Sequence, residues 1–351
     1  MAMVASDVLI DAANLRSLCT TMLEHAGVPG GDARLTAETL VEADLRGVTS
    51  HGTRALPRYL QAIQFGGTKA TPNIQIVRQG PSFAVIDGDA GLGQVIAHKA
   101  MRLAIDLARK TGIAAVAVDN SNHYGAAAFY PMMAAAEGMI GLTTTNGGGK
   151  NMAAFNGAEP VVGNSPLAFA APARDEPPLV LDMAAGVVAQ GKIAVAAMKG
   201  EKIPLGWGLT ADGKDTDDPL KAVIVVPLGP KGYGLAMMLD ILSGPLTGAV
   251  MSVNTNPANR GIDKPSLAGH FFLALDVGSF TDLDIFRDEI DQATRAVRAS
   301  RPREGVQRVF LPGEIEWNTK QKRLKDGIPL HANHAEALAA AATELGVRAP
   351  W

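Results

Sequence analysis

The stretch that says most about how this chain folds is TSHGTRALPR, residues 49–58. Apolar residues at helical spacing precede it over 34–45 and follow it over 56–65, so the stretch lies at the junction of two predicted helices. Gly52 and Pro57 favour a bend between these two helices. The Ser50 hydroxyl, the His51 imidazole and the guanidinium groups of Arg54 and Arg58 therefore gather near one turn. Such a cluster is suited to bind a carboxylate and to move a proton to or from a neighbouring oxygen.

The hydrophobic pattern changes near residue 74. Before it, the period is helical over 11–24, 34–45 and 56–65, with Asp32 as a candidate N-cap. Beyond it, strands are predicted at 74–77, 83–86, 113–118, 140–144, 167–171, 179–181, 223–226 and 271–275. Helices are predicted at 94–111, 123–137, 187–199, 233–242, 284–300 and 334–345, the last with Asn333 as N-cap. Strands and helices do not alternate strictly, which favours a mixed sheet.

These patterns predict an α/β (mixed α+β) fold in two parts. A helical N-terminal region, residues 1–73, is joined by the C-terminal helix over 331–348 and packs on a mixed-sheet domain over 74–330.

Acidic and basic residues nearly balance, 35 against 32, so no nucleic-acid surface is expected. No signal peptide and no membrane-spanning run is visible, and the single cysteine forms no internal disulfide. We expect a cytoplasmic protein without a membrane partner.

The glycine clusters do not form a Rossmann fingerprint, which requires G-x-G-x-x-G between a strand and a helix. Residues 88–93 have the wrong order, and 206–211 lead into a turn-rich segment instead of a helix. Residues 229–234 open a predicted helix and could offer N–H groups to an anion, but they lack the fingerprint. Metal is not predicted either, because His331 and His334 flank a helix start, where capping explains them.

Ordered motifs along the chain resemble those of the type-2 malate/L-lactate dehydrogenase family. The family also includes sulfolactate, ureidoglycolate and diketogulonate oxidoreductases and cyclic-imine reductases. The matching blocks are EADLRGVTSHG at 42–52, LPRY at 56–59, NSNHYG at 120–125, GNSP at 163–166, LDMA at 181–184, GKI at 191–193, IPLGW at 203–207, KGYGLA at 231–236 and LPGE at 311–314. The resemblance implies NAD or NADP bound on a non-Rossmann fold, within about residues 113–275, and a homodimer.

The resemblance also assigns roles to individual residues. It places Ser50, His51 and Asp182 in the catalytic set, with His51 as proton donor. Cofactor-binding residues are implied at His123, Tyr124, Gly125, Ala126, Ala127, Lys231, Gly232, Gly313 and Glu314, and substrate-binding residues at Arg54, Arg58 and Asn164. The chemistry is coherent, because hydride addition to a 2-oxo group creates an alkoxide that a protonated imidazole can neutralise. A carboxylate such as Asp182 would orient that imidazole and favour its charge.

Simpler explanations remain for some of these residues. Asp182 follows a predicted strand and could cap a helix, and His51 could serve only the turn. The family's usual arginine four residues after the signature histidine is Ala55 here, with arginines one position earlier and three later. The substrate therefore need not be malate or lactate. The leading hypothesis is an NAD(P)-dependent dehydrogenase of a small 2-hydroxy or 2-oxo acid; the alternatives are reduction of a cyclic imino acid and a catalytically silent binding protein.

Overall fold

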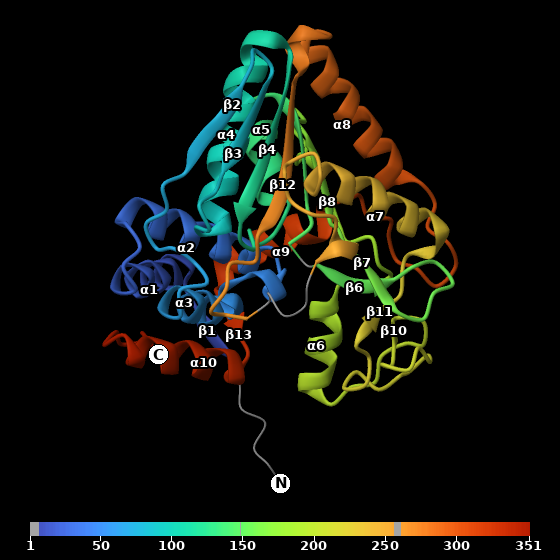
Figure 1. Ribbon diagram of the computed structural model, residues 1–351. Helices are drawn as coiled ribbons and strands as arrows, with labels where there is room; N and C mark the ends of the chain where they lie inside the picture. The colour runs from blue at the N-terminus through green and yellow to red at the C-terminus, as the bar shows by residue number, and fades with distance from the viewer. Residues whose placement is uncertain (1–6, 148, 256–260) are drawn as a thin grey trace.

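The computed structural model describes residues 7–147, 149–255 and 261–351 (Figure 1). Three sheets form its strand framework. The largest has the strand order β2-β3-β4-β12-β5-β8-β9, the second has the order β10-β11-β6-β7, and β1 pairs with β13. The strands are β1 Val8–Ile10, β2 Gln75–Gln79, β3 Phe83–Asp87, β4 Ile113–Ser121, β5 Met139–Thr145, β6 Lys150–Ala153, β7 Pro160–Gly163, β8 Leu167–Ala171, β9 Leu179–Met183, β10 Gly208–Leu209, β11 Ile224–Val225, β12 Ala268–Asp276 and β13 Ile328–Leu330.

Helices surround these sheets. They are α1 Ala12–His25, α2 Gly30–Leu45, α3 Leu56–Gln64, α4 Gly93–Thr111, α5 Phe129–Ala136, α6 Gln190–Lys199, α7 Gly229–Ser243, α8 Leu283–Ala299, α9 Glu314–Asp326 and α10 Ala332–Glu344. Two short 3₁₀ helices, η1 Thr49–His51 and η2 Thr53–Ala55, lie between α2 and α3. None of the helices in the described ranges is long and apolar enough to cross a membrane.

The seven-stranded sheet forms the centre of the larger core. α4 and α5 cover one face, where Met101, Tyr130 and Phe272 are fully buried, and α7 contacts β5 and β12 from the other face (Figure 1). In this sheet as described, only β3 and β4 run parallel, and every other neighbouring pair is antiparallel. A doubly wound dinucleotide fold is built on parallel strands. The predicted mixed, non-Rossmann α/β fold is therefore confirmed.

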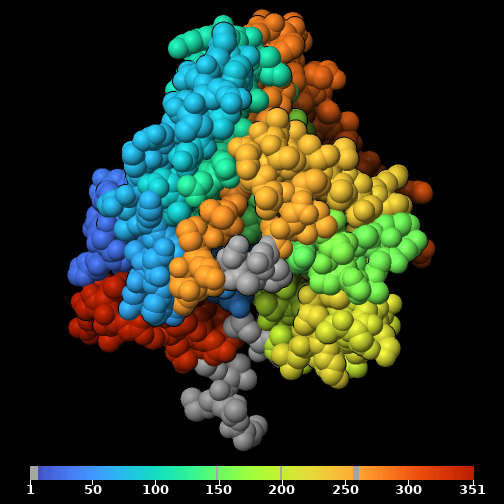
Figure 2. All heavy atoms as spheres, in the orientation of Figure 1, coloured from blue at the N-terminus to red at the C-terminus, as the bar shows by residue number. Residues whose placement is uncertain are grey.

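The two ends of the chain build a second core together. α1, α2 and α3 contribute Leu15, Leu40 and Leu56, and α10 contributes Leu338, all fully buried in one cluster. Figures 1 and 2 show red α10 lying against the blue N-terminal helices. Replacing any one of these leucines by alanine would cost about 2–5 kcal/mol, because it would leave a cavity. The helices that carry residues 49–58 are thus anchored by the C-terminal end of the chain.

Most predicted elements are present, but two cap predictions were wrong. α2 begins at Gly30, with Pro29 in the N-cap position, so Asp32 lies inside the first turn, where its charge complements the helix dipole. α10 begins at Ala332, and its N-cap is His331, whose Nδ1 accepts the N–H of Asn333 at 3.4 Å. Pattern analysis placed both caps inside helices because it located the helix starts by their first apolar residues.

Two further differences affect the candidate site. The helix predicted over 123–137 begins only at Phe129, since Gly125 adopts a left-handed conformation (φ +80°) that interrupts a helix. His123 therefore lies in a loop. The helix α9 and five short strands (β1, β6, β7, β10 and β13) were not predicted. These strands have two to four residues each, which is too short for a clear alternating pattern, and β1 and β13 pair across almost the whole length of the chain.

Candidate active site

The turn that carries Ser50 and His51 is fixed by a buried carboxylate. Asp44, near the end of α2, accepts hydrogen bonds at Oδ2 from the backbone N–H of Thr53 (2.9 Å) and from its hydroxyl (2.6 Å). A Cβ on Gly52 would overlap the Asp44 carboxylate, so the turn requires glycine there. Burial raises the pKa of Asp44 to about 6, although the hydrogen bonds from Thr53 and the charge of Arg323 oppose this shift.

The C-terminal helix reaches this turn through His334. Its Nε2 lies 3.2 Å from the Thr53 hydroxyl. Burial lowers the pKa of His334 to about 4, so the imidazole is neutral near pH 7. Because the Thr53 hydroxyl already donates to Asp44, His334 must donate its Nε2–H to that hydroxyl. The hydrogen bonds from His334 to Thr53 and from Thr53 to Asp44 form a polar chain that connects α10 to α2 and stabilises the turn.

Ser50 and His51 are hydrogen-bonded side by side. The Ser50 Oγ lies 2.9 Å from Nδ1 of His51. Burial lowers the pKa of His51, which favours the neutral imidazole near pH 7. A neutral imidazole is ready to accept a proton, and it becomes a donor only after it has been charged. A Cβ on Gly191 at the start of α6 would lie 2.7 Å from the Ser50 Cβ, so α6 closes over this side of the turn.

His123 comes from a different part of the chain and stacks on His51. The ring centroids are 5.6 Å apart with an interplanar angle of 26°. Nδ1 of His123 lies 2.6 Å from the Tyr59 hydroxyl, at the middle of α3. Sequence analysis assigned His123 to cofactor binding and gave Tyr59 no role. The structure brings His123 into the same cluster as Ser50 and His51, and its assignment to cofactor binding stays a prediction.

Asp182, at the end of β9, has a different partner from the one expected. Its Oδ2 accepts the backbone N–H of Ala128 at the start of α5 (2.9 Å), and no hydrogen bond to His51 is present among the described contacts. Asp182 therefore caps a helix, as the simpler explanation proposed, but the helix is α5 and not the one that follows Asp182 in the sequence. The side chain still reaches solvent, yet the protein around it raises the pKa of Asp182 to about 6 by desolvation, with a smaller contribution from Glu316.

The two arginines of the turn differ in their electrostatic neighbours. Arg58 is exposed on α3. Burial lowers the pKa of His123 to about 3, and the positive charge of Arg58 contributes to that shift. The charge of Arg54 instead contributes to the low pKa of His334, toward α10. Of these two arginines, Arg58 is thus the one whose charge contributes to the low pKa of His123.

Asn164, predicted to contact substrate, connects three backbone segments. Its N–H donates to Asn151 Oδ1 (2.9 Å), and its own Oδ1 accepts the N–H of Gly186 (2.6 Å). Its Nδ2 donates to the carbonyl oxygen of Val188 at 3.4 Å. The amide therefore holds the loop before α6 against the strands β6 and β7.

A family model described as malate/L-lactate dehydrogenase matches residues 10–339 of this chain. The chain belongs to the malate/L-lactate dehydrogenase family. It is 41% identical to a malate dehydrogenase of Pyrococcus abyssi, over 95% of this chain and 94% of that protein. It is 40% identical to an L-sulfolactate dehydrogenase of Methanocaldococcus jannaschii, over 95% of this chain and 96% of that protein. The solved malate dehydrogenase of Pyrococcus horikoshii OT3 superposes with a TM-score of 0.89 at 38% identity, covering 98% of this chain and 97% of that one. The protein is accordingly a dehydrogenase of small hydroxy acids.

Within this dehydrogenase, the residues expected to hold the cofactor lie on three segments. Tyr124 is buried in the sheet core, stacked on His270 with the ring centroids 4.7 Å apart, and Ala126 and Ala127 follow Gly125 in the same loop. Lys231 is exposed in the first turn of α7. A Cβ on Gly232 would lie 2.6 Å from the Ala185 carbonyl oxygen, so this glycine allows α7 to pack closely.

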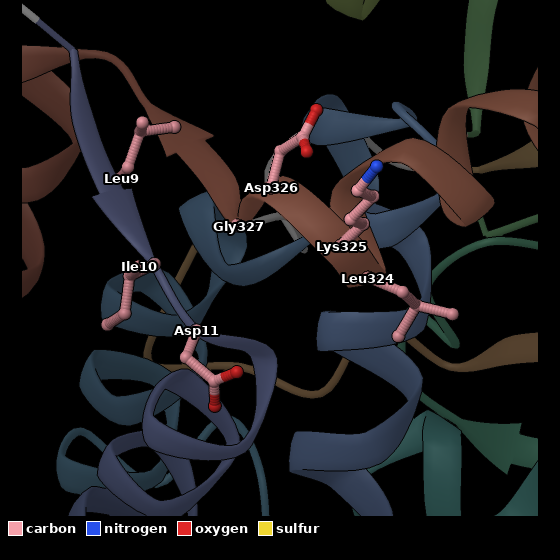
Figure 3. Close-up of a pocket in the computed structure, with 7 residues that line it drawn as sticks. All are labelled: Leu9, Ile10, Asp11, Leu324, Lys325, Asp326 and Gly327. Atoms are coloured by element: carbon pink, nitrogen blue, oxygen red, sulfur yellow. The ribbon is translucent and has the colours of Figure 1, made fainter.

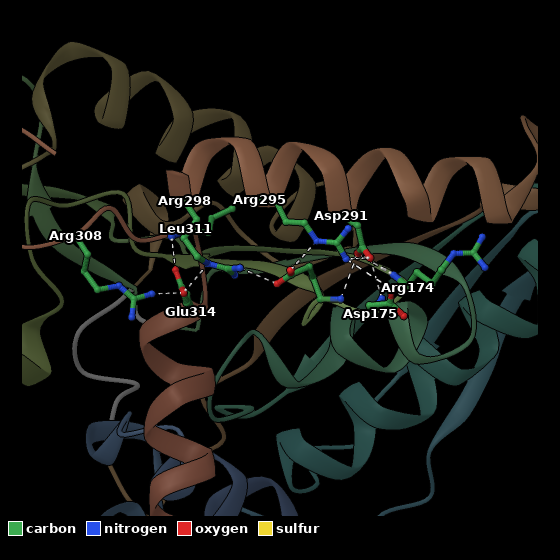
Figure 4. Close-up of polar contacts among 9 residues, drawn as sticks. Arg174, Asp175, Asp291, Arg295, Arg298, Arg308, Leu311 and Glu314 are labelled. Carbon is green, nitrogen blue, oxygen red and sulfur yellow. Dashed lines mark hydrogen bonds and ion pairs between the residues drawn. The ribbon is translucent and has the colours of Figure 1, made fainter. Parts of the chain in front are cut away.

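The third segment contains Gly313 and Glu314, and Figure 4 shows Glu314 with its polar partners. Gly313 is left-handed (φ +80°) and precedes α9. Glu314 accepts the N–H of Leu311 at 3.0 Å and forms ion pairs with Arg298 and Arg308. Burial alone would raise the pKa of Glu314, but these three partners hold it below its usual range. Its carboxylate therefore joins α8 to the start of α9 by ion pairs.

The site offers a match for a nicotinamide. The side chain of Gln94, in the first turn of α4, is fully buried, and neither its amide nitrogen nor its amide oxygen has a hydrogen-bond partner among the described residues. A Cβ on Gly125 would lie 3.7 Å from the Gln94 Nε2, so the amide lies beside the loop that carries His123. A carboxamide pairs with one donor and one acceptor, and the Gln94 amide has one of each. Gln94 was not singled out in the sequence because no motif contains it.

A shallow hollow of about 220 Å³ opens elsewhere, between β1 and the end of α9 (Figure 3). None of the predicted site residues lines it. Its lining is Leu9, Ile10, Asp11, Leu324, Lys325, Asp326 and Gly327. The candidate active site is therefore the surroundings of Ser50, His51 and His123.

Proposed function

We propose that this protein is an NAD(P)-dependent dehydrogenase whose substrate is a small 2-hydroxy acid with a second anionic group. The observation that carries the proposal is the stack of His51 on His123, with Ser50 bonded to the first ring and Tyr59 to the second. Malate and sulfolactate, the substrates named for two relatives, both carry a second anion beside the 2-hydroxy acid. The bound nicotinamide would supply the hydride chemistry.

His51 is the residue we propose to move the proton. When its Nδ1–H donates to Ser50, the Nε2 lone pair is left to take the proton of the substrate hydroxyl. Its lowered pKa suits this role as a base in the oxidation direction. In the reduction direction the same nitrogen returns the proton, and an anionic substrate beside it would favour the charged imidazole.

Arg58 is the cation we propose for a substrate carboxylate, in place of the family arginine at the position of Ala55. It is exposed, and its charge reaches His123, whereas Arg54 acts toward His334. A guanidinium can hold a carboxylate through two hydrogen bonds. Replacing Arg58 by Gln should lower kcat/KM by about 10–100-fold through KM, because a charge-assisted hydrogen bond is lost. A larger effect from Arg54→Gln would transfer this role to Arg54.

Asp182 and Asn164 are proposed to shape the site around these groups. Asp182 holds the start of α5, and so the loop that carries His123, while Asn164 holds the loop before α6, which approaches Ser50. We propose that Gln94 binds the nicotinamide carboxamide, with the Lys231 segment and the Gly313 segment completing the cofactor site.

We propose that the protein is a cytoplasmic homodimer, as in the family. The exposed Met238 and Ile241 of α7 support an interface on that helix.

The decisive experiment measures NADH and NADPH oxidation with a panel of 2-oxo acids and cyclic imines. Oxaloacetate and 3-sulfopyruvate represent the dianionic class, pyruvate the monoanionic class, and a cyclic imino acid the C=N alternative. We expect kcat/KM to be highest for a dianionic 2-oxo acid. Turnover of the cyclic imine alone would replace the proposal by imine reduction, and no turnover with either nicotinamide would indicate a binding protein.

A further inference from the structure

The Tyr59–His123 contact determines where His123 carries its proton. Two groups approach its Nδ1: the Tyr59 hydroxyl at 2.6 Å and the backbone N–H of Gly125 at 3.4 Å. The backbone N–H can only donate, so Nδ1 must offer its lone pair, and the hydroxyl must donate as well. A proton on Nδ1 would face the N–H of Gly125. The neutral ring consequently carries its proton on Nε2.

The environment keeps both partners in these forms. Burial, together with the charges of His51, His270 and Arg58, lowers the pKa of His123 to about 3, so the ring stays neutral at physiological pH. Tyr59 is also buried, and burial raises the pKa of its hydroxyl far above neutrality, so it stays a donor. The Gln94 amide lies beside this hydroxyl and opposes that shift, but it forms no well-aligned hydrogen bond with any described residue.

We propose that Tyr59 is a positioning residue that holds His123 in the Nε2-protonated tautomer, with its ring against His51. His123 then presents a fixed N–H donor to the 2-hydroxy or 2-oxo oxygen, while His51 moves the proton. This inference rests on the proposed function for its catalytic consequence, but the tautomer itself is independent of it. The chain provides a stiff support, because Tyr59 is carried by α3, whose Leu56 is fully buried between the N-terminal helices.

The test combines histidine ¹⁵N NMR with kinetics. In the wild-type protein labelled with ¹⁵N-histidine, the His123 signals, assigned by their loss in His123→Gln, should show protonation at Nε2 alone. In Tyr59→Phe, which keeps the ring but removes the hydroxyl, we expect both tautomers. We also expect kcat to fall by roughly 10–100-fold, as when a residue that orients a functional histidine is lost. The KM for the nicotinamide should change by no more than about threefold, because only the histidine is misplaced.

Tyr130→Phe is the matched control. It removes another buried tyrosine hydroxyl, which donates to the Tyr124 carbonyl oxygen and forms no hydrogen bond to His51 or His123 among the described contacts. We expect it to leave the His123 tautomer and kcat unchanged. Protonation of His123 at Nδ1 in the wild type would overturn the proposal, and so would a Tyr59→Phe protein that keeps the single Nε2 tautomer. If no substrate is turned over, the proposed function fails, while the NMR result still decides the role of Tyr59.

Discussion

Thr53→Val tests the polar chain that braces the catalytic turn. Valine keeps the shape of threonine but lacks the hydroxyl that donates to the fully buried Asp44 carboxylate at 2.6 Å and accepts from His334. A hydrogen bond to a charged group contributes about 1.5–3 kcal/mol, and leaving a buried donor unpaired costs about 1–3 kcal/mol. Because the Thr53 N–H still reaches Asp44, we expect a loss of about 3 kcal/mol in the free energy of unfolding.

The assay is urea denaturation at pH 8, where Asp44 is ionised, followed by circular dichroism. Thr36→Val, in α2, is the matched control, because the buried Thr36 hydroxyl has no partner among the described residues. We expect the control to be neutral or slightly stabilising. Since the turn carries His51, the folded fraction of Thr53→Val should also have a reduced kcat. A loss below about 0.5 kcal/mol, the usual range of surface substitutions, would refute the network reasoning.

Three further predictions follow from the same contacts. His51→Ala should lower kcat by about 10²–10⁴-fold while nicotinamide affinity, measured by fluorescence titration, stays within a few-fold, and Asp182→Asn should show a milder loss; normal turnover in His51→Ala would contradict the assignment. The protein should lose stability below about pH 6.5, because burial lowers the pKa of His270 to about 3 and of His334 to about 4, so the unfolded chain takes up protons first. Asp44, whose pKa is raised to about 6, stabilises the folded protein as the pH falls from about 6 to 4, but the pKa shifts of the histidines are larger. Urea midpoints that stay constant from pH 7.5 to 4.5 would disprove the predicted loss of stability. Light scattering should give twice the 36.5 kDa mass of one chain, and a monomer at working concentration would count against the homodimer.

The turn at residues 49–58 shows which part of the site the hydrophobic pattern predicts correctly and which part it does not. Two amphipathic helices meet at residues 49–58, and that periodicity alone placed Ser50 and His51 at a helix junction. Yet the pattern extended a helix through His123, because the segment is apolar and alanine-rich. The left-handed Gly125 interrupts that helix, and only then does His123 reach His51.

The amino-acid sequence by itself determined the change from helical to mixed pattern near residue 74, the absence of a Rossmann glycine turn, and the motifs shared with the family. These are local properties, since side-chain periodicity and turn chemistry act over a few residues. Only the tertiary structure decided which distant groups meet: Tyr59 with His123, and Thr53 with His334, 281 positions apart. Such contacts depend on how α3, α4 and α10 pack on their shared core, and burial there lowers the pKa of the histidines and raises that of Asp44.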